Sequence, residues 1–187
     1  MSRRLVILDR DGVINHDSDD YIKSPDEWRP IAGSIEAIGR LSNAGFDVAV
    51  ATNQSGIARK YLDVPTLQAI HDKMRRTVRD AGGNIGKIVF CPHLPEDRCD
   101  CRKPGVGLLQ RISHELDVPL DNVPMIGDSE RDIAAARAVG GRPILVLTGN
   151  GAASAEALRA GGEPPEIFAD LAAAATFLLD EAHQRER

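Results

Sequence analysis

The amino-acid sequence predicts an α/β fold: a Rossmann-like, three-layer α/β/α arrangement around a central, mostly parallel sheet. Short uninterrupted apolar runs alternate along the chain with stretches whose apolar residues recur at helical spacing. Such runs are typical of strands that are buried on both faces. Strands that alternate with helices form parallel sheets with right-handed crossovers. A length of 187 residues with 42% hydrophobic residues suits one domain, which we expect to span residues 1–187.

The first half of the chain contains three of the expected strands. Residues 5–8 form the first apolar run, 48–51 the second and 88–90 the third. Between the first two, apolar residues at 35, 38 and 41 indicate a helix, with Ser34 as a candidate N-cap and Gly45 at its end. Before the third run, apolar residues at 67, 70, 74 and 78 predict a second helix, which ends at two consecutive glycines.

The second half repeats the pattern. Leu108, Leu109, Ile112 and Leu116 predict a third helix, and residues 123–126 form the fourth apolar run. A fourth helix is expected around residues 133–139, and it closes at two further glycines. The last expected strand is 144–147 and the last helix is 170–181, followed by a polar tail that we expect to fray.

Composition excludes several classes of function. The 23 basic and 28 acidic side chains give a net charge of −5, and no long basic run offers a surface for nucleic acid. No apolar stretch could span a bilayer, and the apolar run near the N-terminus is too short for a signal peptide. The absence of heptads gives no sign of an oligomer. We therefore expect a cytoplasmic protein that binds neither membranes nor nucleic acid, as a monomer, with an oligomer left open.

Polar residues follow the expected strands at the edge where an open parallel sheet binds ligands. Asp9 and Asp11 follow the first strand, Thr52 the second, and Asp128 the fourth, while Lys103 precedes the third helix. Several carboxylates at one edge repel one another unless a cation lies among them, and a hard, oxygen-coordinating ion such as Mg²⁺ suits them best. A lysine and a hydroxyl nearby favour a phosphate ligand.

All three cysteines lie in the segment CPHLPEDRCDC, residues 91–101. Cys91, His93, Cys99 and Cys101 are four ligands of the kind that tetrahedral Zn²⁺ prefers, and three ordinary thiols are the alternative. Four protein ligands leave no open position on the metal, so we expect the zinc to be structural. The zinc loop would also fix the residues that follow Cys101, which are Arg102 and Lys103.

Four segments in order, LDRDGVIN, ATNQSG, CRKP and GDSERD, resemble the motifs of the haloacid dehalogenase (HAD) superfamily of phosphatases. Within it the whole chain resembles the D-glycero-D-manno-heptose 1,7-bisphosphate 7-phosphatases, a zinc-loop subfamily related to the histidinol phosphatases. The resemblance implies Mg²⁺-dependent hydrolysis of the C7 phosphate, giving heptose 1-phosphate, in the supply of ADP- or GDP-heptose for lipopolysaccharide. It also implies an aspartyl-phosphate intermediate.

The resemblance assigns a role to each matching residue. Asp9 would be the nucleophile and Asp11 the general acid and base. Asp9, Asp128 and the backbone carbonyl of Asp11 would hold Mg²⁺. Thr52, Arg102 and Lys103 would stabilise the transferring phosphate. Contacts to the substrate are expected from Asp17, Asn53, Gln54, Ser55 and Ser129. Asp132 would assist the metal site, orient Lys103, or serve the first turn of its helix.

Many HAD relatives close the site with an inserted cap domain. Here the interval from Asp11 to Thr52 holds only a loop, a helix and a strand, and the interval before Lys103 holds a helix, a strand and the zinc loop. We therefore expect a capless HAD fold. Two other functions stay open. One is a histidinol-phosphate phosphatase, and the other is a zinc-stabilised protein that binds phosphate without hydrolysing it. The presence of both Asp9 and Asp11 argues against a pure binding protein.

Overall fold

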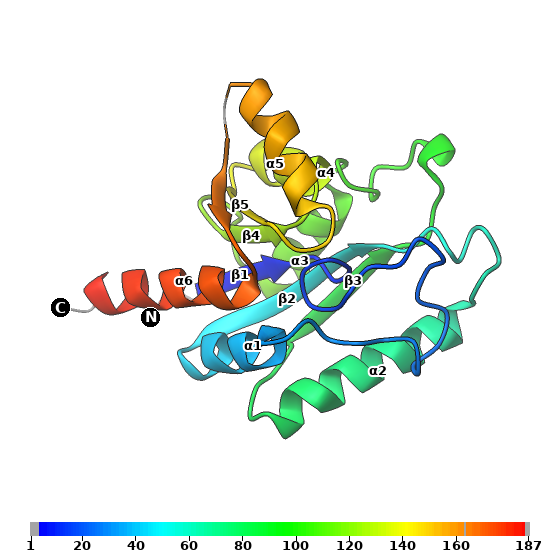
Figure 1. Ribbon diagram of the computed structural model, residues 1–187, viewed down its shortest axis with the longest axis horizontal. Helices are drawn as coiled ribbons and strands as arrows, with labels where there is room; N and C mark the ends of the chain where they lie inside the picture. Colours follow the sequence, from blue (N-terminus) through cyan, green and yellow to red (C-terminus); the bar gives the residue numbers. More distant parts are fainter. Residues whose placement is uncertain (1–3, 163, 186–187) are drawn as a thin grey trace.

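The computed structural model describes residues 4–162 and 164–185, which form a six-stranded sheet with helices on both faces (Figure 1). Every pairing between these strands is parallel. Across the sheet the order is β3 (Lys87–Cys91), β2 (Phe46–Asn53), β1 (Arg4–Leu8), β4 (Pro124–Gly127), β5 (Arg142–Val146) and β6 (Glu166–Phe168). The expected α/β fold with a parallel sheet is therefore confirmed.

The helices form the two outer layers. One face of the sheet is covered by α1 (Ser34–Asn43), α2 (Val64–Asp80) and α6 (Leu171–Arg185), whose apolar residues share one buried cluster with the strands. The other face carries α3 (Gly107–Leu116), α4 (Glu130–Ala138) and α5 (Gly151–Ala160). In Figure 1, α1 and α2 lie below the sheet and α4 and α5 above it. The three-layer arrangement follows from this division.

Two elements carry no apolar pattern that would predict them. Strand β6 has three half-buried residues, and α5 is rich in alanine and buries only Gly151, Ser154 and Ala155. The predicted cap of α1 is wrong: Gly33 takes the N-cap position, while the Ser34 hydroxyl donates to the carbonyl of Ile14 at 2.6 Å and ties down the loop after β1. Helix α6 also continues through Arg185, into the tail that was expected to fray.

The central pair of strands creates the crevice in which the site lies. From β1 the chain moves to β2 on one side, and it returns much later to place β4 on the other side. Leu8 is in register with both Val50 and Ile126, so the residues after these strands emerge at one edge. In doubly wound sheets this reversal of strand order is where ligands bind.

No inserted domain covers this edge in the described part of the chain. The segment 9–33, between β1 and α1, and the segment 54–63, between β2 and α2, contain only turns, bends and isolated bridges. Between β3 and α3 lies the expected zinc loop, with the short 3₁₀ turn η1 (Pro95–Asp97). The capless form of the fold is therefore confirmed. Nor is any helix within 4–162 and 164–185 long and apolar enough to cross a bilayer.

Candidate active site

A cleft of about 260 Å³ opens at the crevice between β1 and β4. Every site residue predicted outside the zinc cluster lines it: Asp9, Asp11, Asp17, Thr52, Asn53, Gln54, Ser55, Arg102, Lys103, Asp128, Ser129 and Asp132. The cleft is also lined by Arg10, Arg131 and Asn150, which the sequence analysis did not single out as site residues. Residues from the ends of three strands and the starts of two helices therefore meet in one place.

Three carboxylates converge at the base of the cleft. One oxygen from each of Asp9, Asp128 and Asp132 lies within 4.8 Å of the others. Burial raises the pKa of Asp9 to about 8, against the lowering effect of Lys103, and the neighbouring aspartates raise it further. Burial likewise raises the pKa of Asp128 to about 6. Carboxylates that resist ionisation because they are close together and buried fit a site for a divalent cation with oxygen ligands.

Lys103 provides the positive charge opposite these carboxylates. Its Nζ lies 2.6 Å from Asp132 Oδ1 and 3.0 Å from Asp9 Oδ1, and it donates to the carbonyl of Ala51 at 2.7 Å. Asp132 and Asp9 raise the lysine pKa although burial alone would lower it, so the ammonium stays charged. The Asn53 amide fixes the lysine backbone: its Nδ2 donates to the carbonyl of Lys103 and its Oδ1 accepts from the backbone N–H.

Asp132 has two contacts that account for its position. Its Oδ2 accepts hydrogen bonds from the backbone N–H and the hydroxyl of Ser129, at 3.0 and 2.6 Å, at the start of α4. Its Oδ1 pairs with Lys103. The carboxylate therefore serves the first turn of the helix and orients the lysine at the same time, and it stands beside the two other aspartates.

Asp128 is held by the loop after β5, which the sequence analysis did not connect with the site. The backbone N–H and the side-chain Nδ2 of Asn150 both donate to Asp128 Oδ2, at 2.8 and 3.2 Å. Thr148 donates to the carbonyl of Gly12 at 2.6 Å. Gly12 has φ +81°, and a Cβ there would overlap the Asp128 carboxylate, so glycine permits this close approach. No motif around Asn150 signals this role.

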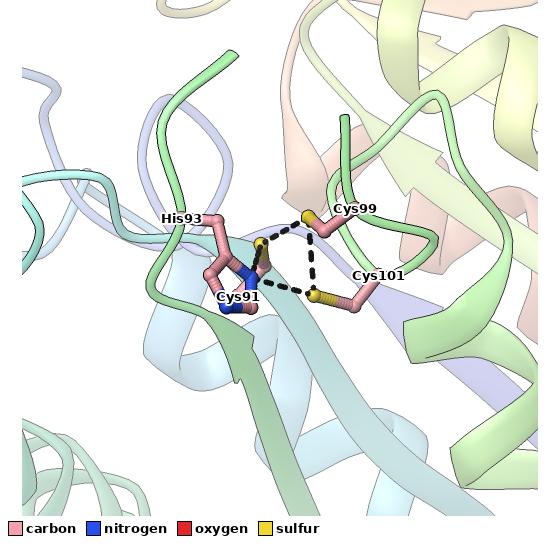
Figure 2. A group of neighbouring side chains, drawn as sticks. All are labelled: Cys91, His93, Cys99 and Cys101. Atoms are coloured by element: carbon pink, nitrogen blue, oxygen red, sulfur yellow. Dashed lines mark hydrogen bonds between the residues drawn. The ribbon is translucent and has the colours of Figure 1, made fainter. Parts of the chain in front are cut away.

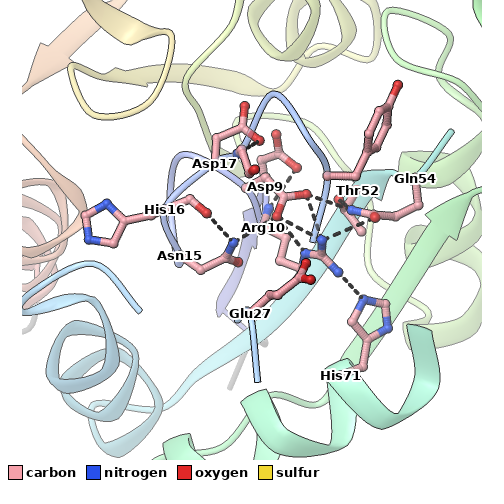
Figure 3. A network of polar contacts seen from close by, with 12 residues as sticks. Asp9, Arg10, Asn15, His16, Asp17, Glu27, Thr52, Gln54 and His71 are labelled. Atoms are coloured by element: carbon pink, nitrogen blue, oxygen red, sulfur yellow. Dashed lines mark hydrogen bonds and ion pairs between the residues drawn. The ribbon is translucent and has the colours of Figure 1, made fainter. Parts of the chain in front are cut away.

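Asp11 stands in a dense group of hydrogen-bond donors, and Figure 3 labels three of the residues that supply them, Arg10, Asn15 and Gln54. Arg10 Nη2 donates to both carboxylate oxygens at 2.9 Å, Asn15 Nδ2 donates to Oδ1 at 2.8 Å, and Gln54 Nε2 donates to Oδ2 at 2.7 Å. Burial opposes the ionisation of Asp11, but the Arg10 charge and these hydrogen bonds lower its pKa below the usual value. Behind Arg10 lies His71 of α2, whose Nε2 is 3.3 Å from Arg10 Nη1.

The other predicted residues stand around the cleft. Thr52 is buried, and its Oγ1 accepts from Gln54 Nε2 at 2.8 Å, which leaves the hydroxyl hydrogen available to donate. Asp17 is exposed at the rim, with Oδ2 3.3 Å from Asn150 Nδ2. Arg102 is half-buried and donates to the carbonyl of His93 at 3.3 Å. Basic side chains thus face the cleft from the zinc loop.

The four predicted zinc ligands form a compact cluster (Figure 2). Cys91 and His93 lie at the end of β3, and Cys99 and Cys101 come from the returning part of the loop. Neighbouring ligand atoms are 3.3 to 3.6 Å apart. A tetrahedral zinc site with ordinary Zn–S and Zn–N bonds has edges of about 3.5 to 3.8 Å. The spacing of these atoms therefore fits zinc.

Comparisons with known proteins agree with this geometry. Residues 100–174 match the family model described as HAD-hydrolase-like. The D-glycero-beta-D-manno-heptose-1,7-bisphosphate 7-phosphatase of Pseudomonas aeruginosa is 57% identical over an alignment of 183 residues that covers 96% of this chain and 99% of the relative. The phosphatase of the same name from Bordetella bronchiseptica is 51% identical and covers 96% of this chain and 99% of its own.

A solved structure gives the same picture in three dimensions. The crystal structure of D,D-heptose 1,7-bisphosphate phosphatase from B. bronchiseptica, complexed with magnesium and phosphate, has a TM-score of 0.90 and 50% sequence identity to this chain. It covers 95% of this chain, and 99% of its own chain is matched.

Proposed function

Because this chain belongs to the family of HAD-like hydrolases that contains the heptose-bisphosphate 7-phosphatases, we propose that it hydrolyses the C7 phosphate of D-glycero-β-D-manno-heptose 1,7-bisphosphate. The products are heptose 1-phosphate and inorganic phosphate. One observation carries the proposal: Asp9 and Asp128, from distant parts of the chain, meet beside Lys103 in a cleft that also contains Asp11. These are the groups that phosphoryl transfer through an aspartate needs.

In the first step a carboxylate oxygen of Asp9 attacks phosphorus, and the bond between phosphorus and the sugar oxygen breaks. The electron pair of that bond leaves with the sugar oxygen, which takes a proton from Asp11. Asp11 is ionised when the cleft contains no phosphate, but a phosphate dianion beside it raises its pKa by like-charge repulsion. Lys103 and Thr52 stabilise the oxygens of the phosphoryl group as it moves.

In the second step water attacks the phosphorus of the aspartyl-phosphate. The water gives a proton to the Asp11 carboxylate, and the bond between phosphorus and the Asp9 oxygen breaks. Phosphate leaves, Asp9 returns to its carboxylate form, and Asp11 is protonated again. Lys103 is also paired with Asp132, so its ammonium keeps one carboxylate partner when Asp9 is phosphorylated.

Two metals belong to the proposal. The carboxylates of Asp9 and Asp128, which lie together with that of Asp132, would hold Mg²⁺ with the backbone carbonyl of Asp11. The ion would supply positive charge that lets an anionic nucleophile approach an anionic phosphate. Cys91, His93, Cys99 and Cys101 hold a structural Zn²⁺, which fixes the segment that carries Arg102 and Lys103.

The rim of the cleft selects the substrate. Arg102 and Arg131 offer positive charge to the distal phosphate, and Asp17, Asn53, Ser55 and Ser129 offer polar contacts to the sugar. Because no cap covers the cleft within the described residues, these loop residues carry the selectivity. We further propose that the chain acts as a single-domain monomer. A cytoplasmic location suits its three cysteines, which form no disulfide and must stay reduced to bind zinc.

The test is phosphate release by purified protein from heptose 1,7-bisphosphate and from histidinol phosphate, with Asp9→Asn as the matched control. We expect a kcat/KM for the heptose substrate that is at least about 100-fold higher than for histidinol phosphate, and no turnover by the variant. Equal release by the two proteins would refute the role of Asp9. A preference for histidinol phosphate would show that this compound, and not heptose 1,7-bisphosphate, is the substrate.

A further inference from the structure

Arg10 is a buried cation beside the cleft whose partners lie within the protein. Its side chain is 1% exposed, and its guanidinium contacts Asp11, Gln54 Oε1 at 3.2 Å and His71 Nε2 at 3.3 Å. Arginine stays charged and has no acceptor, so His71 Nε2 must accept this hydrogen bond. The imidazole is therefore neutral, with its proton on Nδ1. Figure 3 shows Arg10 between His71 and Gln54.

This network fixes the orientation of Asp11. Arg10 binds the carboxylate through Nε at 3.0 Å and through Nη2, which contacts both oxygens. Gln54 donates to the carboxylate through Nε2 and accepts from Arg10 through Oε1, so its amide joins the two residues. Planar, two-point contacts of this kind hold a carboxylate in one orientation, which a single charge contact does not do.

His71 completes the arrangement from another layer of the fold. It lies on α2, is 6% exposed, and does not line the cleft. The centroids of the His71 and Phe90 rings are 6.2 Å apart, so Phe90 limits the movement of the imidazole. His71 reaches the residues that line the cleft through its hydrogen bond with Arg10, so we expect an effect of His71 on the reaction to pass through Arg10.

We propose that Arg10, Gln54 and His71 are positioning residues that hold the Asp11 carboxyl group where it passes a proton to the leaving sugar oxygen. The inference rests on the proposed phosphatase function and deepens it. Misplacing a proton donor slows the departure of an alkoxide, which must be protonated as it leaves. It affects a nitrophenolate far less, because that anion leaves without a proton. A purely structural role for the network would slow both reactions alike.

The experiment measures the release of the leaving group in the first turnover, which isolates the step in which Asp11 gives its proton. The substrates are heptose 1,7-bisphosphate and p-nitrophenyl phosphate. We expect His71→Leu to slow release of the sugar roughly 10-fold and Arg10→Lys roughly 100-fold, within the range that general acid catalysis contributes. Release of nitrophenolate should fall less than about 3-fold in both variants.

His71→Gln is the conservative variant, because a glutamine oxygen can accept the Arg10 hydrogen bond as Nε2 does. We expect it to restore sugar release to within about 3-fold of the unmodified protein. Lys103→Met is the control: it removes a charge beside Asp9 that the phosphate of either substrate would meet, and it should slow both substrates by the same factor. Circular dichroism shows whether each variant is folded. If His71→Leu does not fold, the comparison of the two substrates rests on Arg10→Lys.

Equal losses on the two substrates in Arg10→Lys and His71→Leu, or no loss on either, would overturn the inference. Failure of the proposed function looks different, because the unmodified protein would then not hydrolyse heptose 1,7-bisphosphate. In that case the same comparison runs on any alkyl phosphate that the protein accepts, and the positioning role is still decided.

Discussion

Replacing Lys103 with methionine tests whether the cation is what allows three buried carboxylates to lie together. The lysine Nζ has Asp132 Oδ1 at 2.6 Å and Asp9 Oδ1 at 3.0 Å, and its side chain is only 5% exposed. Methionine keeps most of the volume and removes the charge. Asp9 and Asp132 then lose this partner in the Mg²⁺-free protein, while Asp128 lies close to both of them.

The magnitude follows from the burial of the pair. Removing one partner of a buried ion pair costs about 3 to 5 kcal/mol. For a chain of this size, 1 kcal/mol shifts Tm by about 2 to 4 °C, so we expect Tm to fall by roughly 6 to 20 °C without Mg²⁺. Added Mg²⁺ supplies positive charge to the same carboxylates and should recover part of this loss. Activity should fall at least about 100-fold, since a charge aimed at the transferring phosphate is gone.

Thermal unfolding followed by circular dichroism, with and without Mg²⁺, measures the first effect, and phosphate release measures the second. The control is Lys87→Met, because Lys87 pairs with Glu115 where both side chains are about one-third exposed. A pair at the surface contributes less than about 1 kcal/mol. If Lys103→Met and Lys87→Met have the same Tm in Mg²⁺-free buffer, the buried charge cluster is not what the lysine stabilises, and the reasoning fails.

Three further predictions follow from the other contacts. Asn150→Ala removes the Nδ2 donor to Asp128, and we expect Mg²⁺ affinity, measured by calorimetry, to weaken roughly 10-fold; Asn84→Ala, in an exposed loop, should leave it unchanged. The zinc loop should contain one zinc per chain by elemental analysis, and its three thiols should react with a thiol reagent only after strong chelation; full activity without zinc would contradict the structural role. Burial, with the Arg10 charge, lowers the pKa of His71 to about 3, so the folded protein binds fewer protons than the unfolded chain below about pH 6.5. His71 therefore lowers the free energy of unfolding by about 2 kcal/mol as the pH falls from 6.5 to 5. Measured by urea unfolding, His71→Gln should remove this part of the pH dependence, and an identical pH dependence in the two proteins would contradict the prediction.

The residues of the site can be predicted from the sequence better than the residues that hold them in place. Asp9, Asp11, Thr52, Lys103 and Asp128 each follow a strand or precede a helix in a recognisable motif, and parallel strands place such residues at one edge. The zinc ligands are equally visible, because cysteine and histidine at close spacing have few other uses.

The supporting residues could not be identified in this way. Arg10 lies inside a motif but its partner His71 is on a helix far along the chain, and only the packing of α2 brings them together. Asn150 lies before α5, a helix without an apolar stripe, so neither the helix nor its contact with Asp128 has a signal in the sequence. Side-chain partners between distant elements are set by packing, which a local pattern does not record.

The position of β1 has a consequence for how the protein matures on the ribosome. The strand is synthesised first, yet its second neighbour, β4, emerges more than 100 residues later, and Ile7 pairs with Met125 only then. Closing so long a loop is a late and slow event in folding. A nascent chain that has reached Val123 already contains Asp9, Lys103 and the zinc loop, but not Asp128. The cleft therefore forms only after the strand that completes the middle of the sheet, and the residues that follow it, have been synthesised.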